Sequence, residues 1–167
     1  MSRATIREAI RAWLIGAGAT AVIFADQGAL RPALPYLTVK VRLHDIPHGG
    51  DAIHYRDDDT LLALGERRAA VTVQAFGETA IGELEEAVSR LPLPTAQDTL
   101  TTAGLTVEPV GGLLDLTRVI DEHPEPRASR DFDVLYQRSS DEVAFVEATT
   151  LTTTAEVDDL STTFTES

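Results

Sequence analysis

Two stretches of the chain alternate between apolar and polar residues. In residues 36–44 and 68–76 the odd-numbered positions are apolar and the even-numbered ones are mostly polar. Side chains leave a strand on opposite faces at period two, so each stretch predicts a strand with one apolar and one polar face. This pattern is typical of antiparallel strands with one face on a core. The open face of the predicted sheet would carry Lys40, Arg42, Arg68, Thr72 and Gln74. Such a face can meet a partner subunit, or it can simply meet water.

Helical periodicity marks three other segments. One face of the first collects Ile6, Ile10, Trp13, Leu14 and Ala17. Thr5 and Glu8 form a capping-box pattern that predicts the start of this helix. A second helix is expected up to Leu91, where two prolines follow. Thr95 is expected to cap a short third helix over residues 96–103.

The remaining regular structure is expected to be strand. Short strands are predicted at residues 21–25, 105–110 and 113–120, with a turn at the two glycines 111–112; a short helix would also fit the last of them. Residues 121–130 contain two prolines and predict an exposed loop.

The end of the chain predicts a hairpin followed by a tail. Residues 131–137 alternate, Ser139–Asp141 suggests a turn, and residues 143–148 would return. From Thr149 the chain is rich in threonine and acids and has no base. It is either a disordered end or an arm that orders against a neighbouring subunit.

Between the two alternating stretches lie residues 45–66, too long a segment for a tight hairpin. We interpret them as an extended β-arm. Its acidic run of Asp57, Asp58 and Asp59 is either part of a subunit or partner interface or a solvated turn.

These elements predict one α+β domain over residues 1–148. It has a mainly antiparallel β-sheet, two to three helices packed on one face, and the extended β-arm. Residues 149–167 form the acidic C-terminal arm or tail.

The charge of the chain is −13 and is unevenly distributed. The last 47 residues hold 12 acids and three bases, which gives −9. Binding of nucleic-acid phosphates needs basic patches, so this balance argues against that function. The apolar runs are too short to span a membrane and no signal cleavage pattern is present. We therefore expect a protein that stays in the cytoplasm in which it is made.

Candidate catalytic chemistry is sparse. Residues 16–21 match the G-x-G-x-x-A dinucleotide fingerprint, but they follow a helix and precede a strand, the reverse of the order that phosphate binding requires. The chain has no cysteine, no G-x-S-x-G nucleophile motif and no phosphate-binding G-x-x-x-x-G-K-[ST] loop. We therefore expect no catalytic residues and no cofactor.

One cluster of residue types could bind a metal. It consists of His44, Asp45, His48, Asp51 and His54. Imidazoles and carboxylates together can hold zinc, iron or manganese. No helix-fixed pair orients these side chains, and a polar arm explains the same residues. We expect no metal site, and a metal-dependent enzyme using this region stays as an alternative.

Three motifs resemble one protein family. They are RPALPYLTV from Arg31, RRAAVTVQAFG from Arg67 and DFDVLY from Asp131. They are similar to the neck or tail terminator proteins of tailed bacteriophages. There the first motif leads into a long strand, the second into a helix, and the third forms a late strand. The resemblance extends from the first helix to about Val146.

The resemblance implies a structural virion protein without a cofactor. Such terminators assemble as rings, typically of six subunits, on the head-proximal end of the tail tube. The ring stops tube polymerisation and joins the tail to the neck or head connector. Genomic DNA passes through its lumen without specific binding. The implied location is the virion tail or neck, after assembly in the host cytoplasm. The alternative within this class is another head–tail joining protein, such as a stopper or completion protein.

Overall fold

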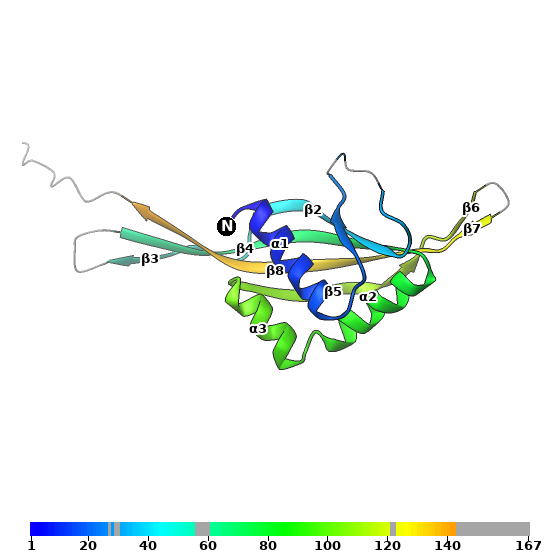
Figure 1. Cartoon of the computed structure of the whole chain (residues 1–167). Helices are drawn as coiled ribbons and strands as arrows, with labels where there is room; N and C mark the ends of the chain where they lie inside the picture. Colours follow the sequence, from blue (N-terminus) through cyan, green and yellow to red (C-terminus); the bar gives the residue numbers. More distant parts are fainter. Residues whose placement is uncertain (27, 29–30, 56–60, 121–122, 143–167) are drawn as a thin grey trace, which may run out of the picture.

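The fold is built around two long antiparallel strands, β4 (Leu61–Phe76) and β8 (Arg127–Glu142). The computed structural model describes residues 1–26, 28, 31–55, 61–120 and 123–142. In it the two strands pair without a break, from Leu61 opposite Glu142 to Phe76 opposite Arg127 (Figure 1). This ladder satisfies backbone hydrogen-bonding groups along the whole length of both strands.

Four further strands extend this pair into a sheet. β2 (Tyr36–Pro47) pairs with β4, and the short β1 (Val22–Phe24) lies parallel outside β2. β5 (Leu105–Asp115) pairs with the other side of β8, so the order is β1-β2-β4-β8-β5. β3 (Ala52–Tyr55) pairs with β4 beyond the end of β2. β6 (Arg118–Ile120) and β7 (His123–Glu125) form a separate hairpin.

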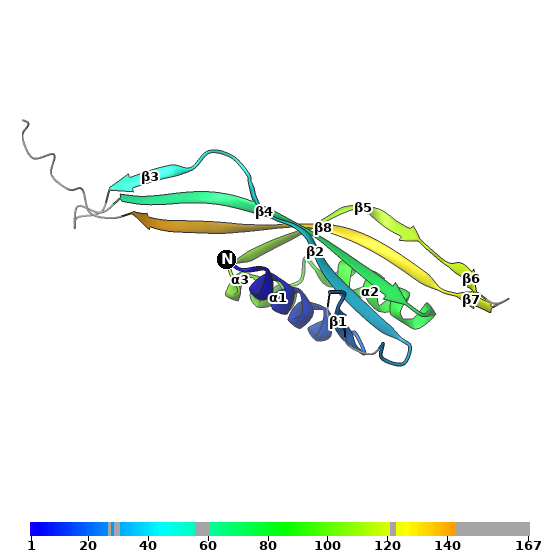
Figure 2. The ribbon, with the colours of Figure 1, turned by 90° about the horizontal axis from the view of Figure 1, so that it is seen from above.

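Three helices cover one face of this sheet: α1 (Arg3–Gly16), α2 (Glu78–Arg90) and α3 (Pro94–Thr102) (Figure 2). Four residues of the apolar face predicted for α1, Ile6, Ile10, Trp13 and Leu14, are buried, while Ala17 is half-buried just past the helix end. Trp13 meets Phe132 of β8 edge to face, with ring centres 5.6 Å apart. The odd-numbered residues of β4 from Ala69 to Ala75 are fully buried beneath the helices. The predicted α+β class, a mainly antiparallel sheet with helices on one face, is thereby confirmed.

Two helices begin earlier in the chain than the sequence predicted. The Oγ of Ser2 accepts a hydrogen bond from the backbone N–H of Thr5 at 3.1 Å, so Ser2 is the N-cap of α1. The predicted cap at Thr5 is wrong because Ser2 offers the same capping chemistry one turn earlier. α3 begins at Pro94 without a side-chain cap, because proline suits a first turn whose N–H groups lack helical partners.

The region after Leu105 differs most from the prediction. β5 continues through Gly111 and Gly112 instead of turning there, and its register shifts between Val110 and Leu114. Gly111 adopts a φ of 67°, which glycine tolerates, so the glycines form a bulge. The stretch predicted as one strand over residues 113–120 is divided between the end of β5 and β6.

The predicted exposed loop at residues 121–130 is also wrong where the structure describes it. These residues contain β7 and the first part of β8. The turn predicted at Ser139–Asp141 is absent, since β8 continues to Glu142. Pairing with Leu62 to Leu64 of β4 outweighs the turn preference of these polar residues. The predicted return strand and the C-terminal tail lie outside the described residues.

The predicted β-arm is present at one end of the molecule. There β3, residues 61–66 of β4 and residues 137–142 of β8 run together beyond the helices (Figures 1 and 2). We call these three strand segments the arm. The sequence pattern did not predict that β8 supplies the third strand of the arm.

Candidate interaction surfaces

The sheet face opposite the helices carries the polar residues predicted for it. Lys40 and Arg42 lie on β2, while Arg68, Thr72 and Gln74 lie on β4. The register brings these strands together, with Lys40 opposite Thr72. The sequence therefore predicted correctly which residues share this face.

Acidic residues of β8 pair with most of them. Arg42 Nη2 donates to Asp131 Oδ2 at 2.8 Å, and Thr72 Oγ1 donates to Asp131 Oδ1 at 2.6 Å. Arg68 Nη1 donates to Asp133 Oδ2 at 3.2 Å. The charges of this face are thus largely balanced within one subunit. The alternation of residues 131–137 already contained the signal, because it places both aspartates on the polar side.

Two other residues of the predicted set behave differently. Gln74 Oε1 accepts a hydrogen bond from Arg127 Nη2 at 2.6 Å. Lys40 is exposed and has no carboxylate partner within the described part of the chain. Thr72 is only 8% exposed, so its own neighbours cover it. Asp57, Asp58 and Asp59 lie outside the described residues.

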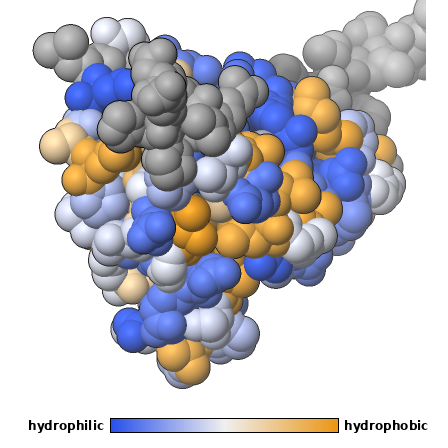
Figure 3. Space-filling view, turned by 90° about the vertical axis from the view of Figure 1, so that its right-hand side faces the viewer, coloured by the Kyte–Doolittle hydropathy of each residue, from blue (hydrophilic) through white to orange (hydrophobic). Residues whose placement is uncertain are grey.

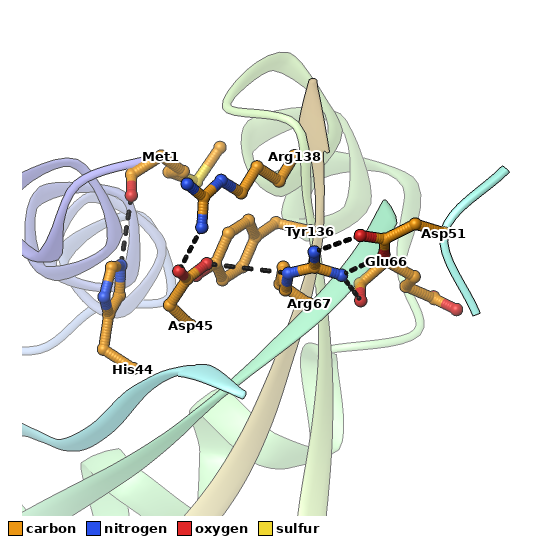
Figure 4. A network of polar contacts seen from close by, with 8 residues as sticks. All are labelled: Met1, His44, Asp45, Asp51, Glu66, Arg67, Tyr136 and Arg138. Carbon is orange, nitrogen blue, oxygen red and sulfur yellow. Dashed lines mark hydrogen bonds and ion pairs between the residues drawn. The ribbon is translucent and has the colours of Figure 1, made fainter. Parts of the chain in front are cut away.

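A polar network lies where the arm leaves the helix-covered half of the sheet (Figure 4). We call it the arm root: Asp45, Asp51, Arg67, Tyr136 and Arg138. Arg67 binds Asp51 with two hydrogen bonds, Nη1 to Oδ1 at 2.6 Å and Nη2 to Oδ2 at 2.8 Å. This two-fold geometry is the strongest form of arginine–carboxylate pairing. It ties β4 to the segment that precedes β3.

Asp45 joins the other strands to the same centre. Arg138 Nη1 donates to its Oδ2, and Tyr136 OH donates to its Oδ1 at 3.4 Å. Arg67 Nε lies 3.8 Å from the same Oδ1. Asp45 has a φ of 61° at a register shift of β2, a conformation that aspartate tolerates better than most residues. The bulge thus directs one carboxylate toward groups from β4 and β8.

The network shifts the acidity of its members. The hydrogen bond from Arg67 lowers the pKa of the Asp51 carboxyl below its ordinary value of 3.8. The same bond raises the pKa of Arg67. Burial, and secondarily the charge of Asp45, raises the pKa of the Tyr136 hydroxyl. Asp51 and Arg67 therefore carry their charges throughout the physiological pH range.

Gly65 leaves room for the central ion pair. A Cβ at this position would collide with the Asp51 carboxylate and with the end of the Arg67 guanidinium. A glycine within a strand is otherwise unfavourable, because it loses more backbone entropy than other residues. Space for the ion pair accounts for this one.

The residues that could bind a metal, His44, Asp45, His48, Asp51 and His54, lie in different surroundings. His44 Nε2 donates to the Met1 carbonyl at 3.1 Å, and its ring stacks on Tyr136. His48 is exposed, and His54 lines a cavity of about 410 Å³ beside β3. Across the ranges that the structure describes, no three histidine, aspartate or glutamate side chains form a metal-binding group. The two aspartates instead belong to the arm root.

The opposite end of the molecule exposes apolar surface (Figure 3). Leu114 of β5 is 61% exposed and Leu116 is 36% exposed. A cavity of about 360 Å³ lies between α2 and the end of β5, and its walls are Glu78, Ile81, Leu113, Asp115, Thr117, Pro126 and Ala128. Apolar side chains grouped in this way suit contact with another protein.

Residues 4–158 match the sequence model of a family described as phage neck terminator protein. The chain belongs to this family. The match covers almost the whole chain, including all three motifs on which the resemblance rested. A comparison with curated proteins gave no match.

Family membership confirms the prediction of a structural bacteriophage protein of the neck terminator kind. The structure also places the motifs as expected. RPALPYLTV leads into β2, RRAAVTVQAFG ends β4 and leads into α2, and DFDVLY lies within β8. No helix among the described residues of this neck terminator is long and apolar enough to cross a membrane.

Proposed function

We propose that this neck terminator forms a ring at the head-proximal end of the phage tail tube. The ring stops tube polymerisation and joins the tail to the neck or head connector. Six subunits would match a tube end with six-fold symmetry. The protein assembles in the host cytoplasm and stays in the virion. Membership in the phage neck terminator family supports this assignment.

The arm is the observation that best supports a joining role. A terminator must reach a component outside its own ring, and the arm extends beyond the helix-covered core (Figure 2). Ion pairs from three segments fix its root. A contact element that is already ordered loses less conformational entropy on binding. The arm therefore suits contact with the tail tube or a neck protein.

The open sheet face supplies the proposed subunit or partner contacts. Lys40 is exposed, and Arg42 and Arg68 are partly exposed beside their aspartates. Charged groups of a partner could replace one member of these ion pairs at little cost in free energy, because exposed ion pairs contribute about 0–1 kcal/mol. Asp57, Asp58 and Asp59, which lie between β3 and β4 in the sequence, belong to the same proposed interface.

The negative net charge of the chain suits a protein that surrounds a channel for DNA. A net charge of −13 per subunit repels phosphates over a Debye length of about 8 Å at physiological salt. Genomic DNA would therefore pass the lumen without specific binding. The joining role requires no cofactor and no catalytic residue.

Electron microscopy of tails tests the proposal. Purified protein added to tail tubes should appear as one ring at the head-proximal end of each tube, and tubes capped in this way should stop growing. Phage that lack the protein should produce tails that do not join heads. A location on the head side of the connector would favour a stopper protein instead. Distribution along the whole tube would contradict both assignments.

A further inference from the structure

Two arginines of α1 lie against an aromatic ring at the edge of the sheet. The guanidinium carbons of Arg7 and Arg11 lie 5.0 and 5.8 Å from the centre of the Phe24 ring. Phe24 ends β1, the outermost strand on this side. The ring attracts the cations and holds them beside the free edge of the sheet.

The open face of the sheet repeats this arrangement further in from the edge, around Phe76 of β4. The guanidinium carbons of Arg127 and Arg31 lie 4.8 and 6.0 Å from the centre of the Phe76 ring, which stacks on Tyr36. A cavity of about 270 Å³ lies here, and Ile23 of β1 also lines it. We call Arg7, Arg11 and the cavity-lining Arg31 the arginine edge, while Arg127 lies further in, on β8.

These four arginines differ from Arg42 and Arg68 of the open face, which are ion-paired. Within the described residues, only Arg11 has a carboxylate partner, Glu8 at 3.6 Å, and both side chains are about half exposed. The Nε groups of Arg7 and Arg127 are buried without a hydrogen-bond partner. An acidic protein thus holds four guanidinium groups in place on rings and leaves most of their charge without a carboxylate.

The opposite edge of the sheet has the opposite charge. α3 and β5 hold three acids, Asp98, Glu108 and Asp115, and no base. Asp98 of α3 and Glu108 of β5 are exposed there and have no cationic partner among the described residues. We call α3 and β5 the acidic edge.

The acidic edge also offers apolar contact but little backbone pairing. Val110 and Leu114 of β5 are 45% and 61% exposed. Pro109 cannot donate a hydrogen bond, and the bulge at the glycines interrupts the edge of the strand. Contact through side chains is therefore favoured over the addition of another strand.

We propose that the arginine edge of one copy docks against the acidic edge of the next copy in the ring. This inference rests on the proposed function, because only a ring requires it. Closed rings arise from contacts between two different patches of the same subunit. Patches at opposite edges of one sheet suit such a head-to-tail arrangement. Their opposite charges favour this orientation, and the pocket of aromatic and arginine groups fits a carboxylate with an apolar neighbour.

A matched pair of single variants gives the first test. Arg11→Glu and Arg90→Glu change the net charge equally, and both arginines lie on helices, are about half exposed and pair with a nearby glutamate. R11E should reduce the population of rings at tube ends several-fold. R90E lies outside the arginine edge and should leave it unchanged. Equal effects of both variants would overturn the inference.

Complementary double variants give the decisive test. Arg7→Glu with Arg11→Glu makes both edges acidic, while Asp98→Arg with Glu108→Arg makes both edges basic. Each variant alone should reduce ring formation by roughly tenfold or more, because like charges then face each other. A 1:1 mixture should restore rings in which the two variants alternate. Circular dichroism checks that both variants are folded.

The outcomes separate the two proposals. If the wild type forms rings and either double variant alone still forms them, the docking inference is overturned and the proposed function stays intact. The same holds if the two double variants fail to form rings when they are mixed. Failure of the wild type to form rings, either free or on tube ends, would overturn the proposed function and with it this inference.

Discussion

The same two strands, β4 and β8, run through two regions of different physical character. In the helix-covered half, Val71, Val73 and Val134 are completely buried. In the arm, the strands have no helix over them, and charged side chains of the arm root replace the apolar layer. The β4–β8 backbone ladder is continuous, so the difference lies in the side chains and in the elements that pack on the two strands.

The comparison separates two sources of stability. Burial of apolar surface stabilises the covered half with little dependence on pH or salt. The arm depends on its hydrogen-bond ladder and on partly exposed ion pairs, which salt screens. The arm should therefore open locally at a lower free energy than the core unfolds. A contact element of this kind can adjust to a partner without loss of the fold.

The largest expected effect comes from the covered half. Trp13→Ala removes a side chain that is 1% exposed and packed against Phe132, so the free energy of unfolding should fall by about 3–5 kcal/mol. Urea denaturation measures this change. Ile53→Ala on the arm is the control, because a side chain that is 65% exposed should change stability by less than about 0.5 kcal/mol. Similar losses of unfolding free energy from both substitutions would contradict the difference between the covered half and the arm.

A smaller and local effect is expected at the arm root. Arg67→Ala removes the ion pair with Asp51 and the contact with Asp45, so amides at residues 62–66 should exchange faster with solvent. Amides at Val71 and Val73 should keep their protection. Glu66→Ala is the control, since Arg67 contacts only its backbone carbonyl. Hydrogen exchange that accelerates equally in both halves would contradict independent opening of the arm.

Gly65→Ala should loosen the same region less. Its Cβ would displace the ends of Asp51 and Arg67, both of which can move without disturbing the backbone. We expect faster exchange near β3 and little change in the free energy of unfolding. Gly82→Ala on α2 meets no atom within 4 Å and should stabilise the protein by about 0.5–1 kcal/mol. An unchanged arm in G65A would show that the ion pair does not hold it.

A lower pH should have the smallest effect on the stability of the arm. The pKa of Asp51 lies below its ordinary value of 3.8 because Arg67 donates to it. Its contribution to arm stability is complete above the unfolded pKa and is lost as pH falls through the folded pKa. Protection factors near β3, in which the pH dependence of intrinsic exchange is divided out, should therefore stay constant between about pH 5 and 8 and fall only in stronger acid. A carboxyl titration by NMR with a midpoint at or above 3.8 would contradict this linkage.

The sequence predicted the covered half better than the arm. Local periodicity identifies α1 and the strand from Tyr36, because each buries one face against a core. The arm root depends instead on long-range pairs, such as Asp45 with Arg138, which lie 93 positions apart. No local pattern contains that information. The polar residues Ser139 and Ser140 suggested a turn. They lie in β8 instead because they pair with β4, and that pairing depends on the whole sheet.

The candidate interaction surfaces follow the same rule. Alternation correctly assigned Lys40 and Arg42 to the open face. It could not show that Arg42 would meet Asp131 from a strand that follows 89 positions later. Arg7 and Arg11 of the arginine edge are four positions apart, so their spacing alone places them on one side of α1. Their stacking on Phe24 required the tertiary arrangement of α1 and β1.

Hydrogen exchange of the protein alone and bound to tail tubes tests the role of the arm most directly. Binding should strongly slow exchange at Ala52–Tyr55 and residues 61–66, while Val71 and Val134 in the core stay unchanged. Arg67→Ala should weaken both the protection and the binding. Arm amides that exchange equally fast in the free and bound protein, with protection gained only elsewhere, would contradict the account.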